Sequence, residues 1–126
     1  MTRVAAFVPD LLFGSQVQGS LRAAGIEVSL VGDQQGVRGA LASADVLVVD
    51  LTAEPERGAS LVESLSKQGL LDSVRTLAFY SHVDLDARRI AERVGFDLIV
   101  PRSRMAREGA ELVTRLAENP DCRAGL

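Results

Sequence analysis

Five short apolar runs, separated by segments long enough to form helices, constrain the fold of this chain more than any other feature of its sequence. The runs cover residues 4–8, 28–31, 46–49, 77–80 and 98–100. The run at 46–49 is apolar on successive residues and not only on alternate ones, as expected of a strand that is covered on both faces. Parallel strands need long crossover connections, so we predict a parallel sheet with helices on both faces.

The segments between the runs carry apolar residues at helical spacing. The clearest segment has them at i, i+3, i+4 and i+7, namely Ala87, Ile90, Ala91 and Val94. Gly95 then follows as a stop signal. For the first helix, we expect Gly14 and Ser15 to precede it, with Ser15 as its cap, and Gly25 to close it in a left-handed conformation.

The chain of 126 residues suits one domain. We place that domain at residues 1–119, followed by a short tail at 120–126. The tail contains Cys122, the only cysteine. A single cysteine excludes an internal disulfide framework and a multi-cysteine metal site. A formal net charge of -3 argues against broad attraction to nucleic acid. No apolar run approaches the roughly 20 residues of a membrane span, and the N-terminus lacks the features of a signal peptide. We therefore expect a cytoplasmic protein that binds no nucleic acid directly and no membrane.

Polar side chains follow four of the five apolar runs. Asp10 comes after the first run, Asp50 directly follows residues 46–49, Ser81 directly follows the fourth run, and Arg102 lies just past the fifth. Because open α/β sheets place their sites at the carboxyl edge of the strands, we expect the four to gather there. A charge directly on a fully buried strand, as at Asp50, is costly unless it has a use. Two acids, a hydroxyl and a cation in one crevice favour chemistry with a phosphoryl group.

Two carboxylates held close together repel each other, and a divalent cation relieves that repulsion. Since Mg²⁺ prefers a few carboxylates plus water and phosphate oxygens, Asp10 and Asp50 are candidates for a weak magnesium site. Ser81 and Arg102 can donate hydrogen bonds to a phosphoryl oxygen on Asp50. The alternative for each residue is an ordinary polar side chain near a strand end. We interpret His82, the only histidine, as a loop residue near the site, because it has no paired nucleophile and no second histidine.

The order of the elements and the positions of these residues resemble the receiver domain of bacterial response regulators, from about residue 3 to residue 119. The segment Val49-Asp50-Leu51 matches that family's phosphoacceptor segment, and Tyr80-Ser81-His82 matches its hydroxyl position. The resemblance implies a flavodoxin-like fold, a doubly wound five-stranded parallel sheet in the order 2-1-3-4-5 with five helices. It also implies phosphoryl transfer from a histidine kinase, with Mg²⁺, and a face that binds another protein.

Carried over residue by residue, the resemblance makes Asp50 the phosphoacceptor, assisted by the hydroxyl of Ser81 and by Arg102 at the position of the family's lysine. It makes Asp10, Asp50 and Thr52 the magnesium ligands. If Arg102 occupies the lysine position, its guanidinium is expected to pair with Asp50 in the resting protein.

This chain matches the family pattern at some positions and differs from it at others, and the two sets of positions favour different functions. Asp50 and Ser81 favour a stand-alone receiver that accepts a phosphoryl group and switches the binding of another protein. Pro9 replaces an acidic residue of the family, Ile99 stands where an aromatic residue is usual, and Arg102 replaces the lysine. These departures favour a pseudo-receiver, an interaction module that works without phosphorylation.

A third class, a small enzyme or ligand-binding domain with a flavodoxin-like fold, lacks its motifs. The sequence contains neither the G-x-G-x-x-G nor the G-x-x-x-x-G-K-[ST] pattern, and neither a flavin-phosphate loop nor a cobalamin signature. We therefore expect a signalling protein and not an enzyme. The expected partners are a histidine kinase or another phosphodonor, a downstream protein, and a second copy of the chain as a homodimer.

Overall fold

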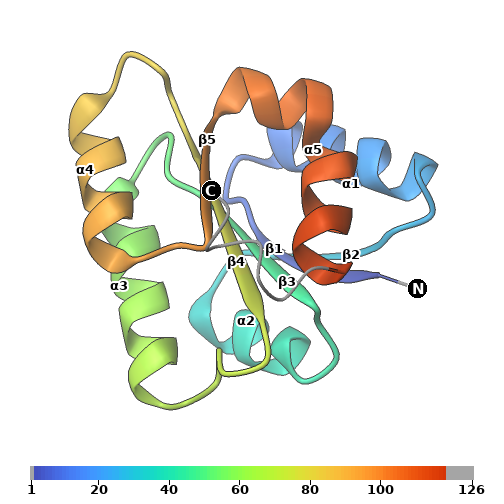
Figure 1. The fold of residues 1–126 in the computed structure, drawn as a ribbon, viewed down its shortest axis with the longest axis horizontal. Coiled ribbons are helices and arrows are strands. Elements are labelled where there is room, and N and C mark those ends of the chain that lie inside the picture. The colour runs from blue at the N-terminus through green and yellow to red at the C-terminus, as the bar shows by residue number, and fades with distance from the viewer. Residues whose placement is uncertain (1, 119–126) are drawn as a thin grey trace.

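The computed structural model describes residues 2–118. One five-stranded sheet runs through the middle, with helices on both sides (Figure 1). In chain order the elements are β1 (Arg3–Phe7), α1 (Leu11–Ala23), β2 (Glu27–Val31), α2 (Gln34–Leu41), β3 (Val46–Asp50), α3 (Pro55–Lys67), β4 (Arg75–Tyr80), α4 (Leu85–Val94), β5 (Leu98–Pro101) and α5 (Arg102–Glu118). The strands pair in parallel in the order β2-β1-β3-β4-β5, which confirms the predicted fold. The predicted tail at 120–126, including Cys122, lies outside the described residues.

Two apolar clusters fill the space between the sheet and its helices. One lies against α1 and α5, and the other against α2, α3 and α4. Strand β3 contributes Val46 and Val48 to the first cluster and Leu47 and Val49 to the second. All four side chains are buried, which explains why this strand is apolar on successive residues. No helix within residues 2–118 is long and apolar enough to cross a lipid bilayer.

Close packing holds the start of α3 against the end of β3. Gly58 lies in the first turn of α3 and is buried. A Cβ atom added at Gly58 would lie 2.5 Å from Cδ2 of Leu51 and 2.9 Å from Cγ1 of Val49. Only glycine allows the helix backbone to approach the strand this closely. The loop from Asp50 to α3 is therefore short and pinned at both ends.

The first helix begins earlier than the sequence predicts. The spacing predicts Ser15 as its cap, but α1 starts at Leu11 and its N-cap residue is Asp10. An aspartate at this position accepts hydrogen bonds from backbone N–H groups that the helix leaves free, and α1 accommodates Ser15 in its interior. The predicted stops are confirmed, because Gly25 and Gly95 have φ values of 83° and 89°.

Candidate functional site

The four polar residues predicted to meet all lie at the carboxyl edge of the sheet. Asp50 is the last residue of β3, Ser81 directly follows β4, and Arg102 directly follows β5. Asp10 lies between β1 and α1. Every strand pair is parallel, so the ends of these strands share one edge. Their side chains, however, have different neighbours.

Asp50 is buried, with 5% of the residue exposed. Its Oδ1 atom accepts one hydrogen bond from the Thr52 backbone N–H at 2.7 Å and another from the Thr52 hydroxyl at 2.6 Å. These bonds offset part of the cost of removing a carboxylate from water. No other residue in the described part of the chain forms a hydrogen bond or ion pair with this carboxylate. Its Oδ2 atom is therefore the oxygen available to a reaction partner.

Asp10 has a structural role at the start of α1. Its Oδ1 atom accepts hydrogen bonds from the backbone N–H groups of Leu12 and Phe13 at 3.0 and 3.1 Å. The negative charge also lies at the positive end of the helix dipole, where it is favourable. Asp10 is exposed, and its second oxygen has no hydrogen bond within residues 2–118. That oxygen remains available to a cation.

Asp10 and Asp50 line one small depression, as the prediction of an acidic pair requires. Its lining residues are Phe7, Pro9, Asp10, Asp50, Ala53, Glu54 and Arg57. Neither Ser81 nor Arg102 is among them. The structure thus brings together the two acids, but it places the predicted hydroxyl and cation outside this depression.

The cation that does line the depression is Arg57, which sequence reasoning missed. Its Nη2 atom donates to the Gly32 carbonyl at 3.1 Å, and its guanidinium carbon lies 5.3 Å from the centre of the Phe7 ring. The sequence offered one signal for Arg57, which is its place near the start of the helix that follows Asp50. Glu54 is the N-cap residue of α3, and Arg57 lies in its first turn.

Arg102 does not form the predicted pair with Asp50. Its guanidinium carbon lies 3.9 Å from the centre of the Phe13 ring, and no ion pair joins it to an acid within the described residues. The cause is the start of α5: the helix begins at Arg102 itself, directly after β5, and the buried Phe13 of α1 offers an aromatic face. A planar guanidinium stacks on such a face without losing all of its hydration.

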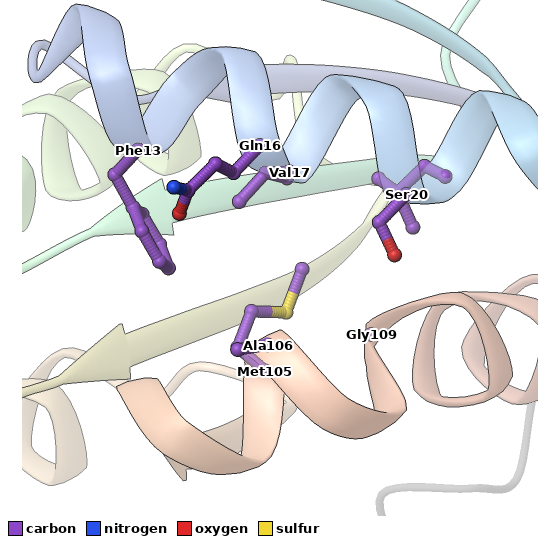
Figure 2. A pocket seen from close by; sticks show the side chains of 8 residues that line it. Phe13, Gln16, Val17, Ser20, Met105, Ala106 and Gly109 are labelled. Atoms are coloured by element: carbon purple, nitrogen blue, oxygen red, sulfur yellow. The ribbon is translucent and has the colours of Figure 1, made fainter.

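The Phe13 ring also borders a hollow between α1 and α5. Figure 2 shows residues of α1 on one side of it and residues of α5 on the other, with the Met105 side chain directed toward α1. The hollow is lined by Phe13, Gln16, Val17, Ser20, Leu21, Met105, Ala106 and Gly109. Arg102 contacts one of its lining residues, Phe13, but does not itself line the hollow.

Ser81 and His82 lie in the loop between β4 and α4. Ser81 is half-buried and His82 is exposed. The Ser81 carbonyl accepts a hydrogen bond from the Asp84 backbone N–H at 2.8 Å, which closes the turn. In the described residues the Ser81 hydroxyl has no hydrogen-bond partner. It is free to turn toward a ligand at the edge of the sheet.

The acidic pair fits a divalent cation only in part. Asp10 and Asp50 each keep one carboxylate oxygen without a hydrogen bond in residues 2–118, and oxygen atoms are the ligands that Mg²⁺ prefers. The same stretch holds no group of three or more His, Cys, Asp or Glu side chains that could bind a metal ion. Pro9, which lines the depression, supplies no ligand. These residues suit a weakly held ion that keeps most of its water.

Four large apolar side chains are exposed around the same edge. Leu11 and Leu12, in the first turn of α1, are 84% and 74% exposed, and Val83 and Leu85, around the start of α4, are 75% and 59% exposed. Leu11 and Leu12 follow Asp10 directly, and Val83 follows the loop of Ser81. The exposed apolar side chains therefore lie in two places at this edge, one at the start of α1 and one around the start of α4.

Neither a protein-family model nor a curated protein matches this sequence. Solved structures do match its fold. The receiver domain of a Francisella response regulator superposes with a TM-score of 0.79 at 16% identity, covering 95% of this chain and 99% of that one. A response regulator from Thermotoga maritima gives a TM-score of 0.76 at 16% identity, covering 94% and 99%. A chemotaxis protein of Vibrio cholerae gives 0.76 at 17% identity, covering 92% and 98%. The chain therefore has the fold of response-regulator receiver domains.

Proposed function

We propose that this protein is a receiver-type signalling domain in which Asp50 accepts a phosphoryl group. The observation that carries the proposal is the setting of Asp50: a buried carboxylate at the end of the central strand, with Oδ1 held by Thr52 and Oδ2 without a partner in residues 2–118. A carboxylate with one oxygen fixed presents the other to an electrophile in a defined direction.

The reaction forms a bond between Oδ2 of Asp50 and the phosphorus of a donor. The donor's bond to that phosphorus, P–N in a phosphohistidine or P–O in an acyl phosphate, breaks, and the leaving group keeps the bonding electron pair. The imidazole of a phosphohistidine takes up a proton from water as it leaves, whereas the carboxylate of an acyl phosphate leaves as the anion. Ser81, half-buried beside β4, donates a hydrogen bond to a phosphoryl oxygen. Arg102 can act in the same way only after it leaves the Phe13 ring.

Mg²⁺ belongs to this proposal as a weakly bound cofactor. Asp10, Asp50 and Thr52 are the residues that would hold it, through the carboxylate oxygens that lack hydrogen bonds and an oxygen of Thr52. The ion would supply positive charge next to the phosphoryl oxygens. In this chain Asp10 also caps α1, so its carboxylate is already oriented before any ion arrives.

The test of the proposal is the intact mass of the protein after incubation with acetyl phosphate and Mg²⁺. We expect the parent protein to gain the mass of one phosphoryl group and Asp50→Ala to gain none. Asp33→Ala is the matched control, because Asp33 caps α2 and lies outside the depression; it should gain the group as the parent does. A parent that stays unmodified under these conditions would overturn the proposal.

The second candidate is an interaction module that binds its partner without phosphorylation. The exposed Leu11, Leu12, Val83 and Leu85 favour it, since they offer an apolar surface in the resting protein. So does Arg102, which stacks on Phe13 and is not paired with Asp50. A partner that binds the parent and Asp50→Ala equally well, but not Leu11→Ser with Leu12→Ser, would favour this second candidate.

A further inference from the structure

The depression beside Asp50 is lined by a positively charged side chain with two contacts of its own. Arg57 is held by the Gly32 carbonyl at 3.1 Å and by the Phe7 ring at 5.3 Å. Its neighbour Gly58 leaves no room for a Cβ atom against Leu51, so the first turn of α3 packs closely on the core. Two neutral contacts therefore orient the guanidinium of Arg57, a residue that is itself exposed.

The positive charge of Arg57 is not used in an ion pair. Both of its contacts are neutral, a carbonyl oxygen and an aromatic face, and within residues 2–118 no acid lies within ion-pair distance of its guanidinium. The depression that it lines also contains Asp10, Asp50 and Glu54. An arginine anchored by neutral partners still acts on any ion that enters this space, because its field is not cancelled by direct contact.

We propose that Arg57 is the built-in counter-cation of Asp50. It lowers the affinity of the resting site for Mg²⁺, and it supplies part of the positive charge that a phosphoryl group on Asp50 requires. This inference rests on the proposed function, because it assigns a role at the same site. Pro9 and Arg57 act in the same direction, because both line the depression and one brings no negative charge while the other adds a positive charge.

The test is a titration of the unmodified protein with Mg²⁺, followed by the NMR shifts of the backbone amides of Asp10 and Asp50. A unit charge beside a divalent ion at a partly exposed site changes its affinity by about tenfold. We expect Arg57→Gln to bind Mg²⁺ about tenfold more tightly than the parent. Arg57→Lys keeps the charge and should stay within about threefold of the parent. Arg57→Met, whose apolar chain can still cover Phe7, should bind Mg²⁺ as Arg57→Gln does. It replaces Arg57→Gln in the experiment if Arg57→Gln does not fold.

Arg93→Gln is the matched control. It makes the same change in net charge, but Arg93 lies in the last turn of α4, at the opposite edge of the sheet, so its Mg²⁺ affinity should equal that of the parent. The proposal is overturned if the folded neutral variants bind no more tightly than the parent, or if they show no response to Mg²⁺ at all. If the parent does not accept a phosphoryl group, the proposed function is wrong. The Mg²⁺ affinities can still be compared in that case, because the titration uses the unmodified protein.

Discussion

The end of β3 and the end of β5 lie on the same edge of the sheet, yet their side chains are held in different ways. At the end of β3, Asp50 is buried and hydrogen-bonded by Thr52. At the end of β5, Arg102 is exposed and rests on an aromatic ring of a neighbouring helix. Parallel strands bring residues to a common edge, but local packing decides whether they touch. Asp50 is therefore held by hydrogen bonds within its own loop, whereas Arg102 is held by Phe13 and not by the acid.

If the end of β3 is the more rigid region, filling the space beside it should have the largest effect on stability. Gly58→Ala would force a Cβ atom to within 2.5 Å of Leu51 Cδ2 and 2.9 Å of Val49 Cγ1. We expect it to lower the free energy of unfolding by about 2–3 kcal/mol, the upper part of the range for overpacking a core. Urea denaturation measures this change.

Gly39→Ala is the control for that substitution. Gly39 also lies in a helix, and a Cβ atom there would meet nothing within 4 Å. The variant should gain up to about 1 kcal/mol, because alanine favours helix over glycine. Equal effects of the two substitutions would show that α3 does not pack on β3 as described.

Removing the Thr52 hydroxyl tests the next contact at the end of β3. Thr52→Val keeps the shape of the side chain but leaves Asp50 with the backbone N–H alone. The free energy of unfolding should fall by about 1–2 kcal/mol, since a partly buried carboxylate loses one hydrogen bond. The same urea experiment on Thr114→Val, a half-buried threonine of α5 far from the site, should show a smaller loss. If Thr52→Val is as stable as the parent, Thr52 does not support the charge of Asp50.

The smallest effect is expected at the end of β5. Arg102→Ala removes a stacking contact with Phe13 and no ion pair, so it should cost about 0.5–1 kcal/mol, the range for an exposed cation–π contact. Arg102→Lys should recover part of that loss. Urea denaturation measures these changes. If Arg102→Ala lowered the free energy of unfolding by about 3 kcal/mol, Arg102 would instead pair with a buried acid, and the two strand ends would not differ as described.

The alternation of apolar runs and helical segments was sufficient to predict the class of fold and the strands. Apolar residues at successive positions of a strand indicate that both of its faces are buried. Connections long enough to hold a helix indicate parallel pairing, because parallel strands need long crossovers. The same reasoning placed Asp10, Asp50, Ser81 and Arg102 at one edge, because the carboxyl ends of parallel strands coincide. The exact start of α1 was not predictable in this way, since both Asp10 and Ser15 are good caps and only the packing of the helix on the sheet selects one.

The sequence by itself determined the architecture and the edge where polar residues collect, because both depend on periodicity and on residues near one another along the chain. Only the tertiary structure decided which side chains meet. It turned Arg102 onto Phe13, since α5 begins without a loop after β5. It also brought Arg57 and Asp50 to line one depression, with α3 packed closely on β3 at Gly58. These contacts join residues from different elements, and no pattern within one segment specifies the distance between them.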